Sequence, residues 1–78
     1  MNTLVKTENI FAKKVWFTDM MLYVQLTDGR EVGVPIEWFP KLRDASEKDR
    51  LDWRFIGNGQ GIHWEEIDED LLVSRLLA

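Results

Sequence analysis

Two short glycine-containing turns, each between segments of alternating hydrophobicity, constrain this fold more than any other feature. Asp28-Gly29 separates residues 21–27 from residues 30–35, and Asn58-Gly59 separates residues 53–57 from residues 61–64. Asp-Gly and Asn-Gly favour tight hairpin turns because both positions tolerate the left-handed backbone region. The sequence therefore predicts two β-hairpins.

The alternation of side chains across the sheet predicts the length of the first turn. A two-residue turn would place the apolar residues of the two strands on opposite faces, which is excluded if one face is core. A three-residue turn, residues 27–29, instead pairs Val24 with Val32 and Leu22 with Val34. We therefore predict this turn, with its glycine left-handed and forming a G1 bulge.

In the second hairpin a two-residue Asn58-Gly59 turn already satisfies the alternation. It places two aromatic–apolar pairs on one face and a polar pair on the other. The predicted pairs are Phe55 with Ile62, Trp53 with Trp64, and Arg54 with His63. The five residues 57–61 are assigned to this hairpin and not to a phosphate-binding loop, because they lack the required glycine spacing and no helix follows them.

The segment between the hairpins predicts two short helices. Pro40 suits the first turn of a helix, and Trp38 and Leu42 fall on one helical face. Ser46, with Asp49 three residues later, resembles a capping box that opens the second helix. Near the C-terminus, acids at 68–70 precede an apolar segment, residues 71–77, which predicts a short final helix.

These elements predict a small α+β fold. The chain has 78 residues, room for one domain, and residues 1–12 are expected to be a loosely ordered or edge segment of it. Two short helices lie between the hairpins of an antiparallel sheet, and a short helix ends the chain. The expected strands lie near residues 14–18, 21–27, 30–35, 53–57 and 61–64.

The distribution of charge argues against direct binding to nucleic acid. Residues 1–54 hold nine acids and nine bases, so the net charge of −4 comes from residues 55–78. A nucleic-acid-binding surface needs a basic patch, and the bases between Lys41 and Arg54 are interleaved with acids. The chain has no Cys, no apolar run of about 18–20 residues and no signal-peptide core. We therefore expect a cytoplasmic protein with no membrane partner.

The densest group of chemically able side chains lies in residues 63–70. One interpretation is a metal site, with His63, Glu65 and Asp68 as candidate ligands. Their spacing matches no established ligand pattern. The favoured interpretation makes His63 a strand-surface residue beside Arg54, with the acids leading into the last helix. We therefore expect no catalytic residue, no cofactor and no enzyme.

Five aromatic side chains could form either a core or a stacking platform for bases: Trp16, Trp38, Phe39, Trp53 and Trp64. The neutral-to-acidic background favours a core, with one or two of them exposed as interface anchors. The final apolar segment is predicted to pack on the core or on a partner. The candidate partner-binding residues are Trp38, Trp64, Glu66, Asp70, Leu72 and Leu76.

Two long motifs together resemble the bacterial domain-of-unknown-function 2442 family. The first is Val34-Pro35-Ile36-Glu37-Trp38-Phe39-Pro40, and the second runs from Gly57 through Gly61-Ile62-His63-Trp64 to Glu69-Asp70-Leu71. The similarity extends over nearly the whole chain from about residue 13. Glu65 stands where Pro is common in the family, and Leu72 stands where a Ser would cap the final helix.

The resemblance implies a small α+β fold with antiparallel strands and no established activity. It also implies a gene that often neighbours that of another small uncharacterised protein. We therefore expect a protein-interaction module, an antitoxin-like partner of a small protein encoded nearby, or a self-associating chain. The alternative is a regulatory domain acting with a DNA-binding partner. A more remote one is a metal-dependent hydrolase using His63, Glu65, Glu66, Asp68 and Asp70.

Overall fold

Two three-stranded antiparallel sheets enclose the core in this computed structural model, which describes residues 10–77. The first sheet has the order β1-β2-β3, and the second has the order β4-β5-β6. The first three strands are β1 (Ala12–Phe17), β2 (Met21–Leu26) and β3 (Glu31–Pro35); the last three are β4 (Trp53–Ile56), β5 (Gly61–Trp64) and β6 (Glu69–Leu72). The predicted α+β class is confirmed, although the two hairpins lie in separate sheets.

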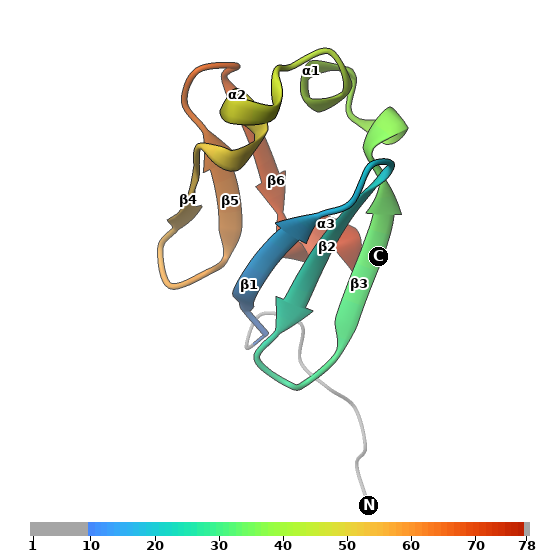
Figure 1. The fold of residues 1–78 in the computed structure, drawn as a ribbon. Coiled ribbons are helices and arrows are strands. Elements are labelled where there is room, and N and C mark those ends of the chain that lie inside the picture. The colour runs from blue at the N-terminus through green and yellow to red at the C-terminus, as the bar shows by residue number, and fades with distance from the viewer. Residues whose placement is uncertain (1–9, 78) are drawn as a thin grey trace, which may run out of the picture.

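A short helical segment joins the two sheets. It consists of a 3₁₀ turn (Ile36–Trp38), α1 (Pro40–Arg43) and α2 (Glu47–Leu51), and a last helix, α3 (Val73–Leu76), follows β6. Figure 1 shows α1 and α2 together at one end of the molecule, near the turn between β1 and β2. We call this end, with the β1–β2 turn and the 3₁₀ turn, the helical end.

The first hairpin has the predicted register and turn. Val24 pairs with Val32 and Leu22 with Val34. Leu26 N–H donates to Arg30 C=O at 2.7 Å, so three residues form the loop. Gly29 has φ 94°, the left-handed conformation that a G1 bulge requires.

The second hairpin has the predicted register but a longer turn. Trp53 pairs with Trp64, and Arg54 with His63, while Ile56 pairs with Gly61, so four residues, 57–60, form the loop. The predicted two-residue turn is wrong. Alternation cannot distinguish a two-residue from a four-residue turn here, because both place the same residues opposite each other. The N–H groups of Gly59 and Gln60 both donate to Ile56 C=O, at 3.2 and 3.0 Å, and this closes the longer loop. Ala12 N–H donates to Gly59 C=O at 2.7 Å, so the loop also ties the second sheet to the first.

The C-terminal segment corrects the prediction of a helix beginning near residue 71. Residues Glu69–Leu72 form a strand that pairs with β5, and the helix has only four residues, Val73–Leu76. Leu71 is buried and Leu72 exposed, the alternation of a half-buried strand. Pairing satisfies the otherwise open side of β5, which outweighs the helical preference of a short leucine-rich segment.

The linking helices follow their predicted capping chemistry. Pro40 is the first residue of α1, and the Ser46 hydroxyl accepts the N–H of Asp49 at 3.1 Å at the start of α2. Leu42 is completely buried. Trp38 does not share its helical face, because it belongs to the separate 3₁₀ turn and points to solvent.

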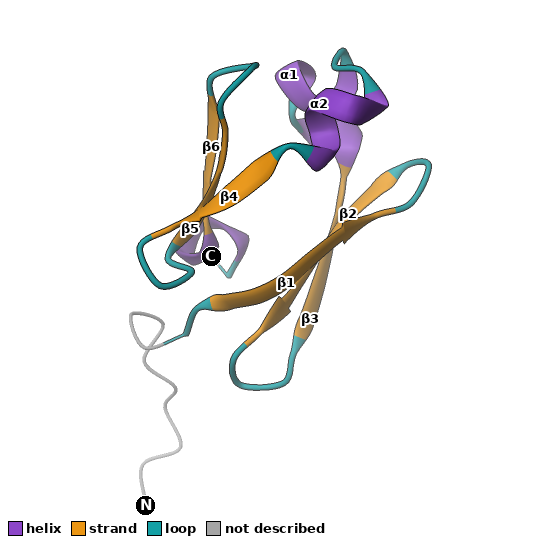
Figure 2. Cartoon of the chain, turned by 60° about the vertical axis from the view of Figure 1, so that its left-hand side comes forward, coloured by secondary structure: helices purple, strands orange, loops and turns teal. Residues whose placement is uncertain are grey.

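The core lies between the inner faces of the two sheets, as Figure 2 indicates by their arrangement. Its fully buried side chains include Leu22, Val24 and Leu26 from β2, and Ile62 and Trp64 from β5. The indole N–H of Trp64 donates to the backbone C=O of Arg50 at 2.8 Å, which satisfies its one polar group. This bond also ties α2 to the second sheet.

Candidate functional site

A row of polar side chains crosses the outer face of the second sheet. The register places Arg54, His63 and Asp70 side by side on the three strands. His63 Nδ1 contacts a carboxylate oxygen of Asp70, and His63 Nε2 lies 3.2 Å from Glu65 Oε1. An Arg54 guanidinium nitrogen lies 3.5 Å from that Glu65 oxygen. Both ring nitrogens of His63 therefore face carboxylates.

This arrangement favours the charged form of the imidazole. Its hydrogen bond with Asp70 raises the pKa of His63 above its ordinary value; partial burial lowers the pKa, and the bond with Glu65 raises it further. The His63 side chain is only 15% exposed, whereas those of its two acidic partners are mostly exposed. The row therefore acts as an electrostatic link between β5 and β6.

The three candidate metal ligands do not converge on a common site. Asp68 lies in the turn between β5 and β6 with φ 51°, and its C=O accepts a hydrogen bond from Lys41 at 2.9 Å. Within residues 10–77, no three His, Asp or Glu side chains are arranged to hold a metal ion. His63 and Glu65 instead bond to each other.

The candidate partner-binding residues occupy very different environments. Trp38 is 68% exposed and Leu72 is 41% exposed, so both can reach another molecule. Trp64 is completely buried, which corrects its place among the candidates, since its packing against the core leaves no surface for a partner. The other three are an exposed Glu66, an Asp70 that bonds to His63, and a half-buried Leu76.

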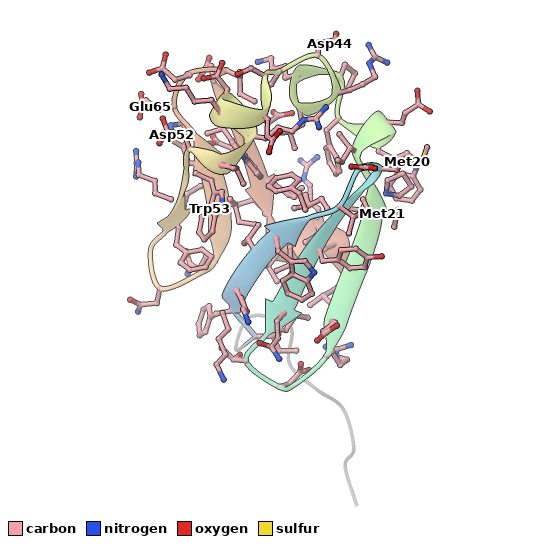
Figure 3. All side chains as sticks on the ribbon, in the orientation of Figure 1. Met20, Met21, Asp44, Asp52, Trp53 and Glu65 are labelled. Atoms are coloured by element: carbon pink, nitrogen blue, oxygen red, sulfur yellow. The ribbon has the colours of Figure 1, made fainter. Side chains whose placement is uncertain are left out.

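The helical end exposes two apolar side chains that the sequence did not single out. Met20 is 72% exposed in the β1–β2 turn, and Leu51 is 58% exposed at the end of α2. Figure 3 shows Met20 and Met21 where the β1–β2 turn approaches the end of β3. Neither Met20 in a turn nor Leu51 at the end of a five-residue helix carries a sequence signal, because exposure depends on which parts of the fold pack over each side chain.

Two adjoining hollows lie beside these side chains. The larger, of about 610 Å³, is lined by Met20, Met21, Pro35 and Ile36 together with charged residues. The smaller, of about 240 Å³, is lined by Phe17 and Leu51 among others. Asp19 and Arg50 line both hollows. Arg50 is fixed there, since its guanidinium donates to the backbone C=O of Leu42 at 2.8 Å and of Arg43 at 2.9 Å.

A third hollow, of about 480 Å³, runs beside β3. Val32, Gly33 and Val34 line one side, and Leu71, Arg75 and Leu76 line the other, with Trp38 and Phe39 also in its wall. Trp38 and Leu76 are both among the candidate partner-binding residues, although they lie far apart in the sequence. The fold brings them to the same hollow, which we call the β3 groove.

The fold and these surfaces define a small α+β domain of two three-stranded sheets with apolar surface at its helical end. The family described as "Protein of unknown function (DUF2442)" matches residues 12–78, and the chain belongs to that family. The resemblance read from the sequence motifs is therefore confirmed.

The chain is also similar to a protein of unknown function from Rhodospirillum rubrum ATCC 11170, known from a crystal structure. The two share 27% sequence identity over 88% of this chain and 86% of that chain, with a TM-score of 0.76. No curated protein matches the chain. No helix in the described part of the chain is long and apolar enough to cross a membrane.

Proposed function

We propose that this chain acts in the cytoplasm as a protein-interaction module whose helical end binds a small protein encoded nearby, in the manner of an antitoxin. The observation that carries the proposal is the exposure of Met20, Trp38 and Leu51, at 72%, 68% and 58%. Large apolar side chains that gather on one part of a small domain are typical of an interaction surface.

The hollows beside these side chains support the same interpretation. Binding energy at interfaces concentrates where an anchor side chain fills a pocket surrounded by polar groups. The larger hollow has an apolar wall, with Asp19, Glu37 and two arginines also lining it. Because Arg50 is already held by backbone carbonyls, its ordering would add little entropic cost on binding.

The test is co-expression of this chain with the protein encoded by the neighbouring gene, followed by light scattering on the size-exclusion peak. We expect one peak with the summed mass of both chains. Met20→Lys and Leu51→Lys should each weaken the complex by about tenfold or more, because a charge then enters an apolar contact.

Leu72→Lys is the matched control, since it also replaces an exposed leucine but lies on β6. It should leave the complex unchanged. Two independent peaks from the unmodified pair would overturn the interaction proposal. Loss of the complex in the Leu72 variant alone would overturn its assignment to the helical end and favour the C-terminal segment.

A further inference from the structure

β3 has β2 on one side, and none of the other described strands pairs along its opposite side. Leu26 N–H donates to Arg30 C=O at 2.7 Å and Ile36 N–H donates to Met20 C=O at 2.9 Å. In an antiparallel ladder, residues that exchange hydrogen bonds alternate with residues that do not. The even-numbered residues of β3 therefore bond to β2, and the odd-numbered residues direct their backbone groups outward.

The outward-facing residues are Glu31, Gly33 and Pro35. Glu31 and Gly33 each present an N–H and a C=O, whereas Pro35 presents only a C=O because proline has no amide hydrogen. Such a row of backbone groups is a template for another strand. At the Pro35 end, this row of backbone groups lacks an N–H donor.

Two of the other three edge strands, β1 and β6, carry devices that discourage pairing, and the middle of β3 does not. β1 has a register irregularity between Ala12 and Lys14 and two consecutive lysines, and β6 has two consecutive acids. Bulges and charges of this kind protect sheet edges. The middle of β3, Val32-Gly33-Val34, has no charge and no proline.

We propose that β3 pairs antiparallel with β3 of a second copy of this chain, with Gly33 opposite the partner subunit's Gly33. In this register the two glycines exchange N–H and C=O groups. Each Glu31 N–H donates to the C=O of the partner subunit's Pro35. Every outward-facing N–H is then satisfied, and the missing donor of Pro35 leaves only the C=O of Glu31 to water.

This register also matches side chains on the core side of the sheet. Val32 lies opposite the partner subunit's Val34, on the face that borders the β3 groove. The apolar side chains of the added strand therefore meet the apolar wall that Leu71 and Leu76 form. A self-pairing of this kind is two-fold symmetric, so each copy fills the groove of the other.

The packing on the outer face of the first sheet explains why residue 33, at the centre of β3, is a glycine. A Cβ built on Gly33 would lie 2.6 Å from a ring carbon of Tyr23, so the tyrosine ring covers the middle of β3. Trp16 stacks on Tyr23 with ring centroids 5.5 Å apart. In the paired state, the two tyrosine rings would shield the central hydrogen bonds from water.

The charges along β3 permit a second copy as the occupant. Arg30, which precedes the strand, is already paired with Asp28 of its own turn at 2.7 Å. Glu31 faces Pro35, so no like charges are opposed along the strand. The paired strand contains none of Met20, Trp38 and Leu51, although Trp38 lines the adjoining β3 groove. The strand pairing therefore does not depend on the proposed function.

Sedimentation equilibrium of the full chain tests the proposal, from micromolar to millimolar concentration. We expect a monomer–dimer equilibrium. Amide hydrogen exchange of Glu31 and Gly33 should slow as concentration rises, whereas Val32 and Val34, already bonded to β2, should not change. A monomer at every concentration would overturn the proposal. Amide exchange rates of Glu31 and Gly33 that do not change with concentration would also overturn it.

Glu31→Pro provides the sharper test, because proline is tolerated at the first residue of an edge strand and removes one outward N–H from each copy. We expect the dimer dissociation constant to rise by about tenfold or more. Glu31→Gln, which removes the charge and keeps the N–H, is the control and should retain the dimer. Equal dissociation constants for the two variants would show that pairing does not use this edge.

Discussion

His63 has the most extensive side-chain contacts of any polar residue on the second sheet. Its imidazole bridges Asp70 on β6 and Glu65 just beyond β5, with Arg54 adjacent on β4. Arg54, His63 and Asp70 lie on three different strands, and strand pairing brings them together, whereas Glu65 lies only two residues beyond His63. The cluster therefore depends chiefly on the register of the three strands.

The stability that His63 contributes should depend on pH in a defined direction. Its pKa in the folded protein is raised, chiefly by Asp70. A group whose pKa is raised by folding stabilises the fold when the pH is below its pKa in the unfolded chain, near 6.5 for His. This contribution is lost as the pH rises through the pKa of the folded protein. Urea unfolding of His63→Gln should therefore show a larger deficit against the unmodified chain at about pH 5 than at about pH 9. An equal deficit at both pH values would contradict this account.

Gly59 should be the glycine that tolerates alanine least. Both Gly59 and Gly29 have a left-handed backbone, with φ 103° and 94°. A Cβ on Gly29 meets nothing, so Gly29→Ala should cost only the conformational strain of about 1–2 kcal/mol. A Cβ on Gly59 would overlap the backbone of Ala12, which should add roughly 1–3 kcal/mol. Chemical denaturation of the two variants gives the comparison, and equal losses would contradict the close approach.

At the scale of elements, the two hairpins and the C-terminal segment were predictable to different degrees. Alternation fixed the register of both hairpins, because slipping by one residue exchanges core and solvent faces. It left the second turn ambiguous between two and four residues. The C-terminal segment combines acids, leucines and an arginine in a pattern that suits a helix, and only the free side of β5 makes it a strand.

The assignment of β6 predicts contrasting costs for two neighbouring leucines. Leu71 is 5% exposed on the inner face, so Leu71→Ala should lower the free energy of unfolding by about 2–5 kcal/mol. Leu72 is 41% exposed on the outer face, and Leu72→Ala should change it by no more than about 0.5 kcal/mol. Thermal or urea unfolding measures both. Similar costs for the two substitutions would contradict the inward and outward positions of these residues on β6.

At the scale of the whole molecule, Trp64 joins parts that lie far apart in the sequence. Its ring lies in the core shared by both sheets, and its indole N–H reaches α2 through the C=O of Arg50. The turn at Gly59 and the N–H of Ala12 make a second connection between the sheets. The two sheets should therefore unfold together.

Trp64→Phe tests that cooperativity. The substitution removes the hydrogen bond and leaves the C=O of Arg50 without this donor, which should cost at least about 1–3 kcal/mol. Amide exchange should show the slowest amides of β2 and β5 losing protection by the same free energy. Loss confined to β5 would show that the sheets are independent units.

The sequence by itself determined the class of fold, the registers of the two hairpins, the Ser46 cap of α2 and the family, because each depends on local periodicity, turn chemistry or motif. Only the tertiary structure decided that the hairpins form two sheets, that residues 69–72 complete the second, and that Trp64 is buried while Met20 and Leu51 are exposed. Strand partners and side-chain exposure depend on which surfaces the rest of the chain leaves uncovered. No local pattern carries that information.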